Sequence, residues 1–234
     1  MTESAARPQF QAILDGEGDR YFERVRDHTL QEADPEKDPP MRMIATYNLH
    51  PRNVLEVGAA NGYRLAALAR LYGCRASGVE PGEVAVSDGR GRFPDVRLEQ
   101  GRGDAIPFEE QFDLVIINFV FHWIDRSVLL KTVAEIDRVV DDGGFLLIGD
   151  FYPRHATRAR YHHLPGSQIY TYKQDWSAMF VASGSYRTLA MLSGKHPTSP
   201  PTADVDDGDR MATWLLQKRL DGMYTSDGGG DNPG

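Results

Sequence analysis

The sequence lacks several features that would place it in a specialised class of protein. Cys74 is the single cysteine among 234 residues, so an internal disulfide framework is excluded and the thiol is expected to fill a small core position. No run approaches the roughly twenty apolar residues of a membrane span. The N-terminal stretch MTESAARPQF has neither the basic nor the apolar region of a secretory signal. We therefore expect a cytoplasmic protein with no membrane partner.

An excess of basic residues is also missing. The formal net charge is −8. Because wholesale nucleic-acid binding relies on a basic face, this charge disfavours nucleic acid as a partner. Hydrophobic residues make up 41% and charged residues 26% of the chain, as in ordinary globular domains. This length and composition suit one α/β domain with a small appendage. We expect a helical cap over residues 1–50, the main domain over 51–225 and a disordered tail over 226–234.

One stretch organises the main domain, residues 53–71 with the sequence NVLEVGAANGYRLAALARL. It begins with a short run rich in branched residues, turns through glycines and continues with apolar residues at helical spacing. A buried strand, a glycine turn and a helix N-terminus together form a nucleotide-binding corner. Counted from Gly58, the dinucleotide-binding fingerprint needs small residues at the positions of Ala60 and Tyr63. Because Tyr63 is large, the sequence is a poor match to that fingerprint.

Further signals follow in order along the chain. CRASGVE, residues 74–80, predicts a second strand that ends in Glu80, and residues 96–100 alternate like a third strand before Asp104. FDLVIINF, residues 112–119, reads as a strand buried on both faces. A helix over residues 128–140 and an Asp-Asp-Gly-Gly turn precede a fifth strand that starts at residue 145, and residues 186–192 and 211–216 predict a final hairpin.

This ordered set resembles the class I S-adenosylmethionine (SAM)-dependent methyltransferases over roughly residues 50–220. The resemblance rests on Glu56, Gly58 and Gly62 of the corner, on Glu80, on Asp104, on the FDLVIINF strand and on the DDGG turn. It implies a doubly wound α/β fold with seven strands, mostly parallel, the last strand antiparallel and helices on both faces. It also implies a ligand site at the carboxyl ends of the strands, an N-terminal cap and an insert after the fifth strand.

The resemblance further implies SAM as cofactor and S-adenosylhomocysteine (SAH) as product. Glu80 would accept hydrogen bonds from the ribose hydroxyls, Asp104 from the adenine amine, and the Ala105 N–H would donate to a ring nitrogen. Asn118 would contact the methionine end and Phe119 the adenosine. The expected cofactor-binding residues are Glu56, Gly58, Ala60, Gly62, Glu80, Asp104, Ala105, Asn118 and Phe119.

Because the sulfonium donor is already activated, the protein has to position the acceptor and, where needed, take its proton. His122, which follows the fourth strand, is the first candidate base, and His162 and His163 come next; each also fits a structural or surface role. His155, His162 and His163 have no compact ligand spacing, so no metal site is expected. Candidate acceptor-binding residues are aromatic side chains near the cleft or in the insert: Trp123, Tyr152, Tyr161, Tyr170 and Tyr172.

The fourth strand is followed by Asn118-Phe119-Val120-Phe121 rather than the Asn/Asp-Pro-Pro-Tyr/Phe motif of DNA methyltransferases. We therefore expect a small polar acceptor methylated on O or N: a sugar, an amino acid derivative or a natural-product intermediate. A homodimer is compatible with this function. The alternatives are a SAM-binding regulatory partner without turnover, an NAD(P)-dependent oxidoreductase, and an RNA or protein methyltransferase.

Overall fold

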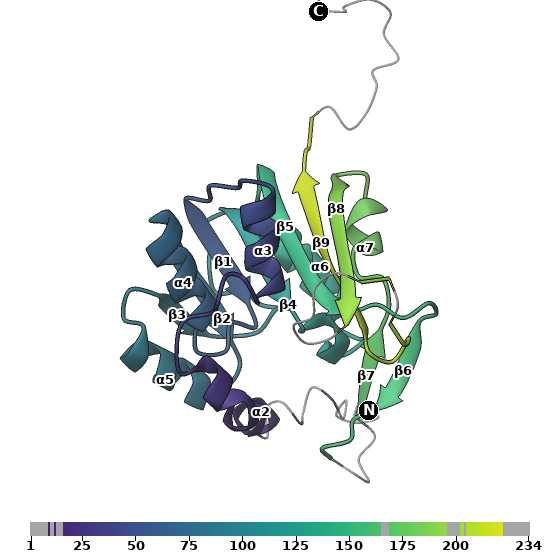
Figure 1. The fold of residues 1–234 in the computed structure, drawn as a ribbon, viewed down its shortest axis with the longest axis horizontal. Coiled ribbons are helices and arrows are strands. Elements are labelled where there is room, and N and C mark those ends of the chain that lie inside the picture. Colours follow the sequence, from purple (N-terminus) through teal and green to yellow (C-terminus); the bar gives the residue numbers. More distant parts are fainter. Residues whose placement is uncertain are drawn as a thin grey trace, which may run out of the picture.

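The structure, a computed structural model, describes residues 9, 12, 16–164, 169–195, 202–203 and 205–221. Within these residues one seven-stranded sheet has the order β3-β2-β1-β4-β5-β9-β8 (Figure 1). β1 pairs in parallel with β2 and β4, and the parallel pairing continues outward to β3 and β5, whereas β9 is antiparallel to both β5 and β8. The strands are β1 (Asn53–Val57), β2 (Arg75–Glu80), β3 (Arg97–Gln100), β4 (Phe112–Asn118), β5 (Val140–Phe151), β8 (Tyr186–Lys195) and β9 (Arg210–Lys218).

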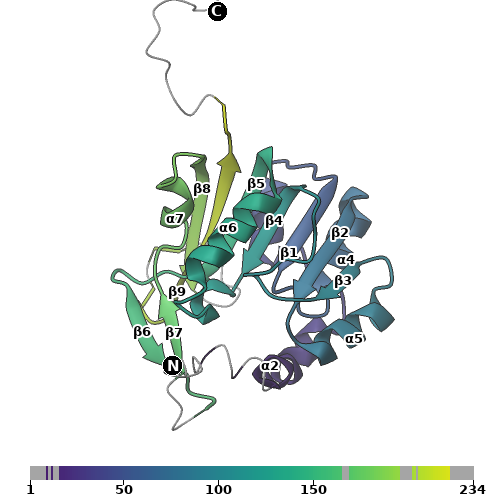
Figure 2. The same cartoon turned by 180° about the vertical axis from the view of Figure 1, so that it is seen from behind.

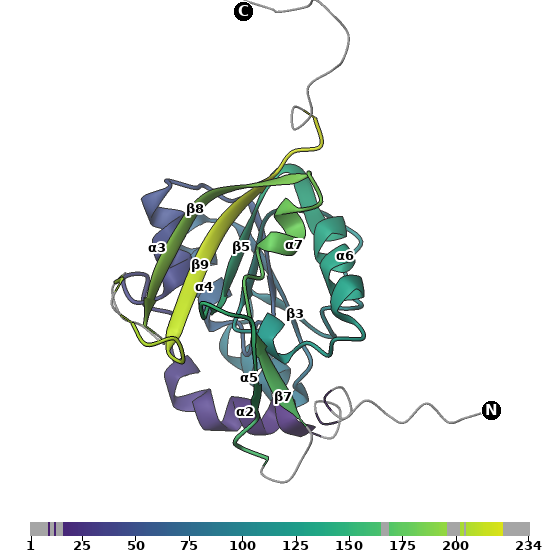
Figure 3. The ribbon, with the colours of Figure 1, turned by 90° about the vertical axis from the view of Figure 1, so that its right-hand side faces the viewer.

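Helices cover both faces of the sheet. α3 (Pro39–Thr46), α4 (Tyr63–Tyr72) and α5 (Glu83–Arg92) contribute to one hydrophobic cluster, and α6 (Leu129–Val139) and α7 (Ala178–Val181) contribute to another. Figure 3 shows α3 on one side of the sheet and α6 and α7 on the other, and Figure 2 shows the side with α6 and α7. The doubly wound α/β fold expected from the sequence is thereby confirmed.

The central strand β4 explains why both faces are covered. Leu114 and Ile116 belong to the cluster under α3 and α4, while Val115 and Ile117 belong to the cluster under α6 and α7. All four side chains are at most 1% exposed. Since successive strand side chains point to opposite faces, an uninterrupted apolar run fits only a strand that lies between two helical layers.

Two structures from outside this core lie at the carboxyl ends of the parallel strands. One is the N-terminal cap, with α2 (Gly18–Val25) followed by the 3-10 helix η2 (Arg26–Thr29). The other is a two-stranded hairpin in the insert after β5, formed by β6 (Thr157–Arg160) and β7 (Tyr170–Lys173). Figure 1 shows α2 and this hairpin at the same end of the sheet.

The fifth strand begins earlier than the sequence predicts. β5 begins at Val140, because the Asp-Asp-Gly-Gly segment forms an irregularity within the strand, where Phe112 pairs with Val140 and Leu114 with Phe145. Gly143, with φ of +81°, supplies the left-handed residue that this irregularity needs. Two helices are short: α2 ends at Val25, where the 3-10 geometry of η2 begins, and α7 covers only four residues. The predicted tail, residues 226–234, lies outside the described residues.

Candidate active site

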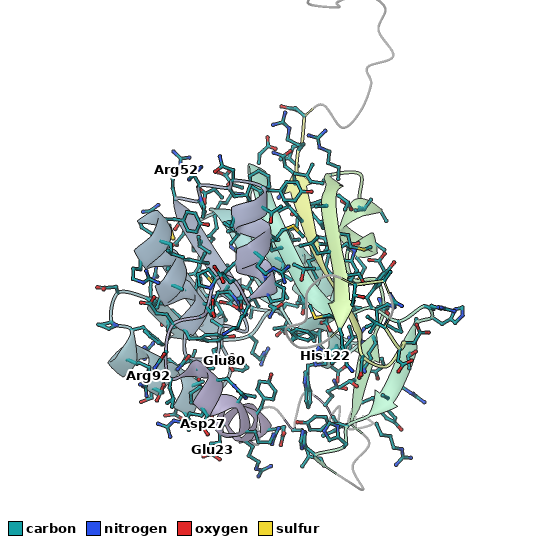
Figure 4. All side chains as sticks on the ribbon, viewed as in Figure 1. Glu23, Asp27, Arg52, Glu80, Arg92 and His122 are labelled. Atoms are coloured by element: carbon teal, nitrogen blue, oxygen red, sulfur yellow. The ribbon has the colours of Figure 1, made fainter. Side chains whose placement is uncertain are left out.

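A cavity of about 890 Å³ opens at the carboxyl ends of β1, β2 and β4. Its walls come from the N-terminal cap between residues 17 and 39 and from the loops after β1, β2, β3 and β4. Figure 4 shows the side chains of Glu80 and His122 at this end of the sheet. In a doubly wound sheet this is the edge where ligands bind, and the volume is that of a small-molecule site.

The glycine corner brings bare backbone to the cavity wall. Gly58 has φ of +78°, and a Cβ on it would lie 2.2 Å from Val120 Cγ2. Ala60 has φ of +48°, an unusual value for a residue other than glycine. Gly58 and Ala60 line the cavity, whereas Gly62, with φ of +80°, lies behind it and caps the N-terminus of α4. The corner is therefore built for close approach of a ligand to backbone.

Glu80, at the end of β2, lies in the cavity wall. Its Oε2 accepts a hydrogen bond from the Ala60 N–H (3.0 Å) and its Oε1 accepts one from the Gly82 N–H (3.0 Å). Burial raises the pKa of Glu80 to about 7, although these two hydrogen bonds act to lower it. The carboxylate is thus fixed in position, and further donors would stabilise its charged form.

Glu56 stands one layer behind the cavity. It is 1% exposed and pairs with Arg64, whose guanidinium also holds Asp38 at 2.8 Å. Burial raises the pKa of Glu56 to about 7, opposed by Arg64. For Arg64, burial acts to lower the pKa, but Asp38 and Glu56 outweigh it and raise the pKa. Arg64 lines the cavity and Glu56 does not, so Glu56 acts in this structure by holding Arg64.

The loop after β3 places Asp104 in the cavity wall. The carboxylate is buried and receives two hydrogen bonds from Arg102, at 2.9 and 3.1 Å. Ala105 is exposed and does not line the cavity, and its N–H donates to the Arg102 carbonyl (3.1 Å). A hydrogen bond from this N–H to adenine would therefore require that turn to open, whereas Asp104 needs no such change to meet a ligand.

Asn118 and Phe119 line the cavity where β4 ends. The Asn118 Oδ1 is buried and accepts no hydrogen bond. Phe119 has φ of +56°, a strained value for a bulky residue, and its N–H donates to the Gly149 carbonyl (2.7 Å). Strain held by a fixed hydrogen bond and an unsatisfied amide oxygen are features that functional sites commonly have.

His122 lies on the 3-10 turn η3 (Phe121–Trp123) that follows β4. It is 6% exposed, and its backbone N–H donates to Oδ2 of the fully buried Asp150 (3.1 Å). Its Nδ1 lies 2.9 Å from Asp150 Oδ1, although the angle is not that of a hydrogen bond. The imidazole does not line the cavity but lies edge-on to Phe119, which does.

The other predicted residues divide between the cavity and the insert. Trp123 lines the cavity. The Tyr161 ring contacts the Trp123 ring, with the two centroids 4.2 Å apart. His162 and His163 are exposed on the turn after β6, outside the cavity wall. The remaining tyrosines also lie elsewhere: Tyr152 lines a second, shallower hollow, Tyr170 stacks under Arg158 and Tyr172 under Arg126.

A cluster that sequence reasoning missed joins the cap to the insert. Glu17 Oε1 accepts hydrogen bonds from the Tyr161 hydroxyl (2.8 Å) and from Arg24 Nη2 (2.6 Å). Glu17 and Tyr161 lie far apart in the sequence, and no local pattern marks Glu17 as a cavity residue. Arg64 was missed because its helical position alone does not reveal that its side chain turns back toward Asp38.

The residues that the structure describes hold no group of three or more His, Cys, Asp or Glu side chains placed to bind a metal ion. Among them, too, there is no helix with both the length and the apolar character needed to cross a bilayer.

Comparison with known proteins agrees with this geometry. Residues 54–144 match the family model described as a methyltransferase domain. A protein of Haemophilus influenzae described as uncharacterized is 29% identical over 168 residues, which are 67% of this chain and 66% of that protein. The chain thus spans just under two thirds of that relative's length.

Solved structures share the fold. The 1,6-didemethyltoxoflavin-N1-methyltransferase of Burkholderia thailandensis has a TM-score of 0.69 at 18% identity, over 94% of this chain and 93% of that chain. The glycopeptide N-methyltransferase MtfA with bound SAH has a TM-score of 0.59 at 14% identity, over 80% and 91%. The N-methyltransferase NodS of Bradyrhizobium japonicum has a TM-score of 0.54 at 14% identity, over 90% and 98%.

The matched segment, residues 54–144, contains the glycine corner, Glu80, Asp104 and β4, which together form most of the cavity wall beneath the cap. This segment lies within a seven-stranded sheet whose last strand, β9, is antiparallel, as the resemblance implied. Residues 54–144 thus match a methyltransferase domain, and the chain has the doubly wound fold of the methyltransferase structures compared above.

Proposed function

We propose that the protein transfers a methyl group from SAM to an O or N atom of a small polar acceptor. The candidate acceptors are a sugar, an amino acid derivative or a natural-product intermediate. The observation that carries this proposal is the single cavity in which the glycine corner, Glu80 and Asp104 meet the aromatic residues after β4. Its volume of about 890 Å³ lies near the upper end of the roughly 300–1,000 Å³ of small-ligand sites.

The cofactor would lie along the parallel strands. Glu80 is held by two backbone N–H groups with its carboxylate at the cavity, where ribose hydroxyls could donate to it. Asp104 would accept from the adenine amine on the opposite side, and the bare backbone of Gly58 and Ala60 would admit the methionine part. Bound SAM would supply a methyl group on a positively charged sulfur, and the residues of the chain would align the acceptor with it.

His122 is the proposed general base. Asp150 accepts a hydrogen bond from its backbone N–H, and the same carboxylate lies 2.9 Å from Nδ1, which leaves Nε2 as the atom that would take a proton. None of the three candidate histidines lines the cavity, but His122 is buried against Phe119, which does, whereas the two insert histidines are exposed and are weaker candidates.

Two similar structures support a nitrogen acceptor of modest size. The toxoflavin-type enzyme was solved with 1,6-didemethyltoxoflavin and SAH bound, and MtfA is a glycopeptide N-methyltransferase. At 18% and 14% identity these likenesses show the fold, so the acceptor of this chain has to be determined directly.

The test is to incubate the protein with methyl-labelled SAM and a bacterial extract split into small molecules, protein and nucleic acid. The proposal predicts that label appears in the small-molecule fraction together with SAH. Label confined to protein or nucleic acid would contradict a small acceptor. Nicotinamide oxidation or reduction without label transfer would favour the oxidoreductase alternative.

A further inference from the structure

Only one of the two carboxylate oxygens of Glu17, which lines the cavity, accepts hydrogen bonds. Glu17 is 2% exposed, and its Oε1 is held by Tyr161 and Arg24. Its Oε2 is buried and accepts no hydrogen bond, and Arg20 Nη1 lies 3.6 Å from it. Because leaving a buried acceptor unsatisfied is costly, this atom calls for a donor, and Glu17 lines the cavity from which a ligand could supply one.

The same part of the cavity has an aromatic wall. Tyr161, which donates to Glu17, meets Trp123 edge to face with ring centroids 4.2 Å apart, and Trp123 lines the cavity. The carboxylate and the indole are therefore linked through one tyrosine. A carboxylate beside aromatic rings suits a ligand that has a positively charged or N–H-donating head and an apolar body.

The charge of the cavity wall also favours a positively charged ligand. Three cationic side chains line it, and each pairs with a lining carboxylate: Arg64 with Asp38, Arg102 with Asp104 and Lys37 with Asp34. Five further lining residues are acidic: Glu17, Asp27, Glu32, Glu80 and Asp125. Such a lining attracts cations and repels anions.

The arginines beside Glu17 do not reverse this preference. The side chains of Arg20 and Arg24 are 58% and 32% exposed, so water and salt screen their charges, whereas the Glu17 side chain is 3% exposed. Arg24 also donates to Oε1, which leaves Oε2 as the oxygen available to a ligand.

We propose that the acceptor is an amine, bound with its nitrogen donating to Glu17 Oε2 and its apolar body against Trp123. This inference rests on the proposed methyl transfer and narrows it to one acceptor class. Glu17 is then a positioning residue that decides between acceptors by the hydrogen bond it accepts.

Methyl transfer to an amine conserves atoms and electrons. An alkylammonium ion first gives one proton to a base or to water, which frees the nitrogen lone pair. The lone pair attacks the methyl carbon as the carbon–sulfur bond breaks, and the bonding electrons stay on sulfur. The products are a methylated ammonium ion and the neutral thioether SAH.

The first test is made on the full chain saturated with SAH, using three probes that share one ring: 2-phenylethylamine, 2-phenylethanol and phenylacetate. Calorimetry should show the amine binding about tenfold or more tightly than the alcohol and the acid. Of the three probes, only the amine carries a positive charge on the group that donates to the Glu17 carboxylate. Equal or tighter binding of the alcohol or the acid, or no measurable binding of the amine, would overturn the proposal. Failure of SAH itself to bind would instead refute the proposed function.

The second test changes the carboxylate. Glu17→Gln should weaken amine binding about tenfold or more and leave SAH affinity within about twofold. Glu23→Gln is the matched control, since Glu23 lies exposed on α2, which begins directly after Glu17, and outside the cavity wall; Figure 4 labels it. Tyr161→Phe, which keeps the ring and removes the hydroxyl that holds Glu17, should weaken amine binding to a smaller degree.

Two outcomes of the second test would overturn the proposal. Unchanged amine binding in Glu17→Gln would remove Glu17 from the acceptor site. A loss of SAH affinity of tenfold or more in that variant would assign Glu17 to the cofactor. If Glu17→Gln does not fold, the comparison rests on Tyr161→Phe, where unchanged amine binding refutes the role of Glu17.

Discussion

Cofactor binding should depend on pH through Glu80. Burial raises the pKa of this carboxyl group to about 7 in the free protein, and ribose hydroxyls would donate to its charged form. At pH 8 most of Glu80 is ionised, whereas at pH 6 only about a tenth of it is. If SAH binds the ionised form, its apparent affinity should fall about tenfold between pH 8 and pH 6.

Calorimetric titration with SAH across this pH range measures the effect. SAH suits the experiment because its own carboxyl group and adenine titrate below the range and its amino group above it. Glu80→Gln cannot ionise, so its affinity should be weaker than that of the natural protein at pH 8, by about 1–3 kcal/mol for the lost charged acceptor, and nearly independent of pH.

A second buried acid has to be separated from Glu80. Burial also raises the pKa of Glu56 to about 7, but Glu56 lies behind the cavity wall and holds Arg64. Any pH dependence that survives in Glu80→Gln can therefore be assigned by testing Glu56→Gln. The reasoning fails if the natural protein binds SAH equally at pH 6 and pH 8, or if Glu80→Gln keeps the full pH dependence.

Three further variants test separate parts of the site. Gly58→Ala should lower SAH affinity about tenfold or more, and its backbone strain alone should lower the stability of the fold by roughly 1–2 kcal/mol. Adding Val120→Ala should relieve only the clash between the new Cβ and Val120. Unchanged SAH affinity in Gly58→Ala would contradict a close approach of the ligand to the Gly58 backbone. Arg64→Met should lower the free energy of unfolding in urea by about 3–5 kcal/mol, because it leaves Glu56 without its buried partner, and an unchanged midpoint would refute that pairing. His122→Ala should lower kcat by about 10²–10⁴-fold with little change in SAH affinity if His122 is the base, and full turnover would exclude it.

The parts of the site that sequence reasoning found are those carried by short, regular segments. Glu80 could be predicted because a parallel strand delivers its last residue to the ligand edge, and the Pro-Gly that follows marks the end of the strand. Gly58 could be predicted for the same reason, since strand, turn and helix adjoin in the sequence. The fold followed from the same regular segments, β4 above all, whose apolar run requires helices on both faces.

The parts that it missed depend on contacts between distant segments. Glu17 meets Tyr161 only after the cap and the insert have folded over the same edge of the sheet, so Glu17 is not marked by its neighbours in the sequence. Tyr170 and Tyr172 looked equivalent to Tyr161 in composition, but β7 turns their rings toward arginines. The hydrogen bond that engages the Ala105 N–H is a property of one turn, which residue type alone does not reveal.

The most direct test of the account is a calorimetric titration of the full chain with SAH at pH 8, with NADH titrated in parallel. The account predicts saturable binding of SAH and no binding of NADH, because Tyr63 occupies the position where a dinucleotide fingerprint needs a small residue. Binding of NADH without binding of SAH would contradict the central claim.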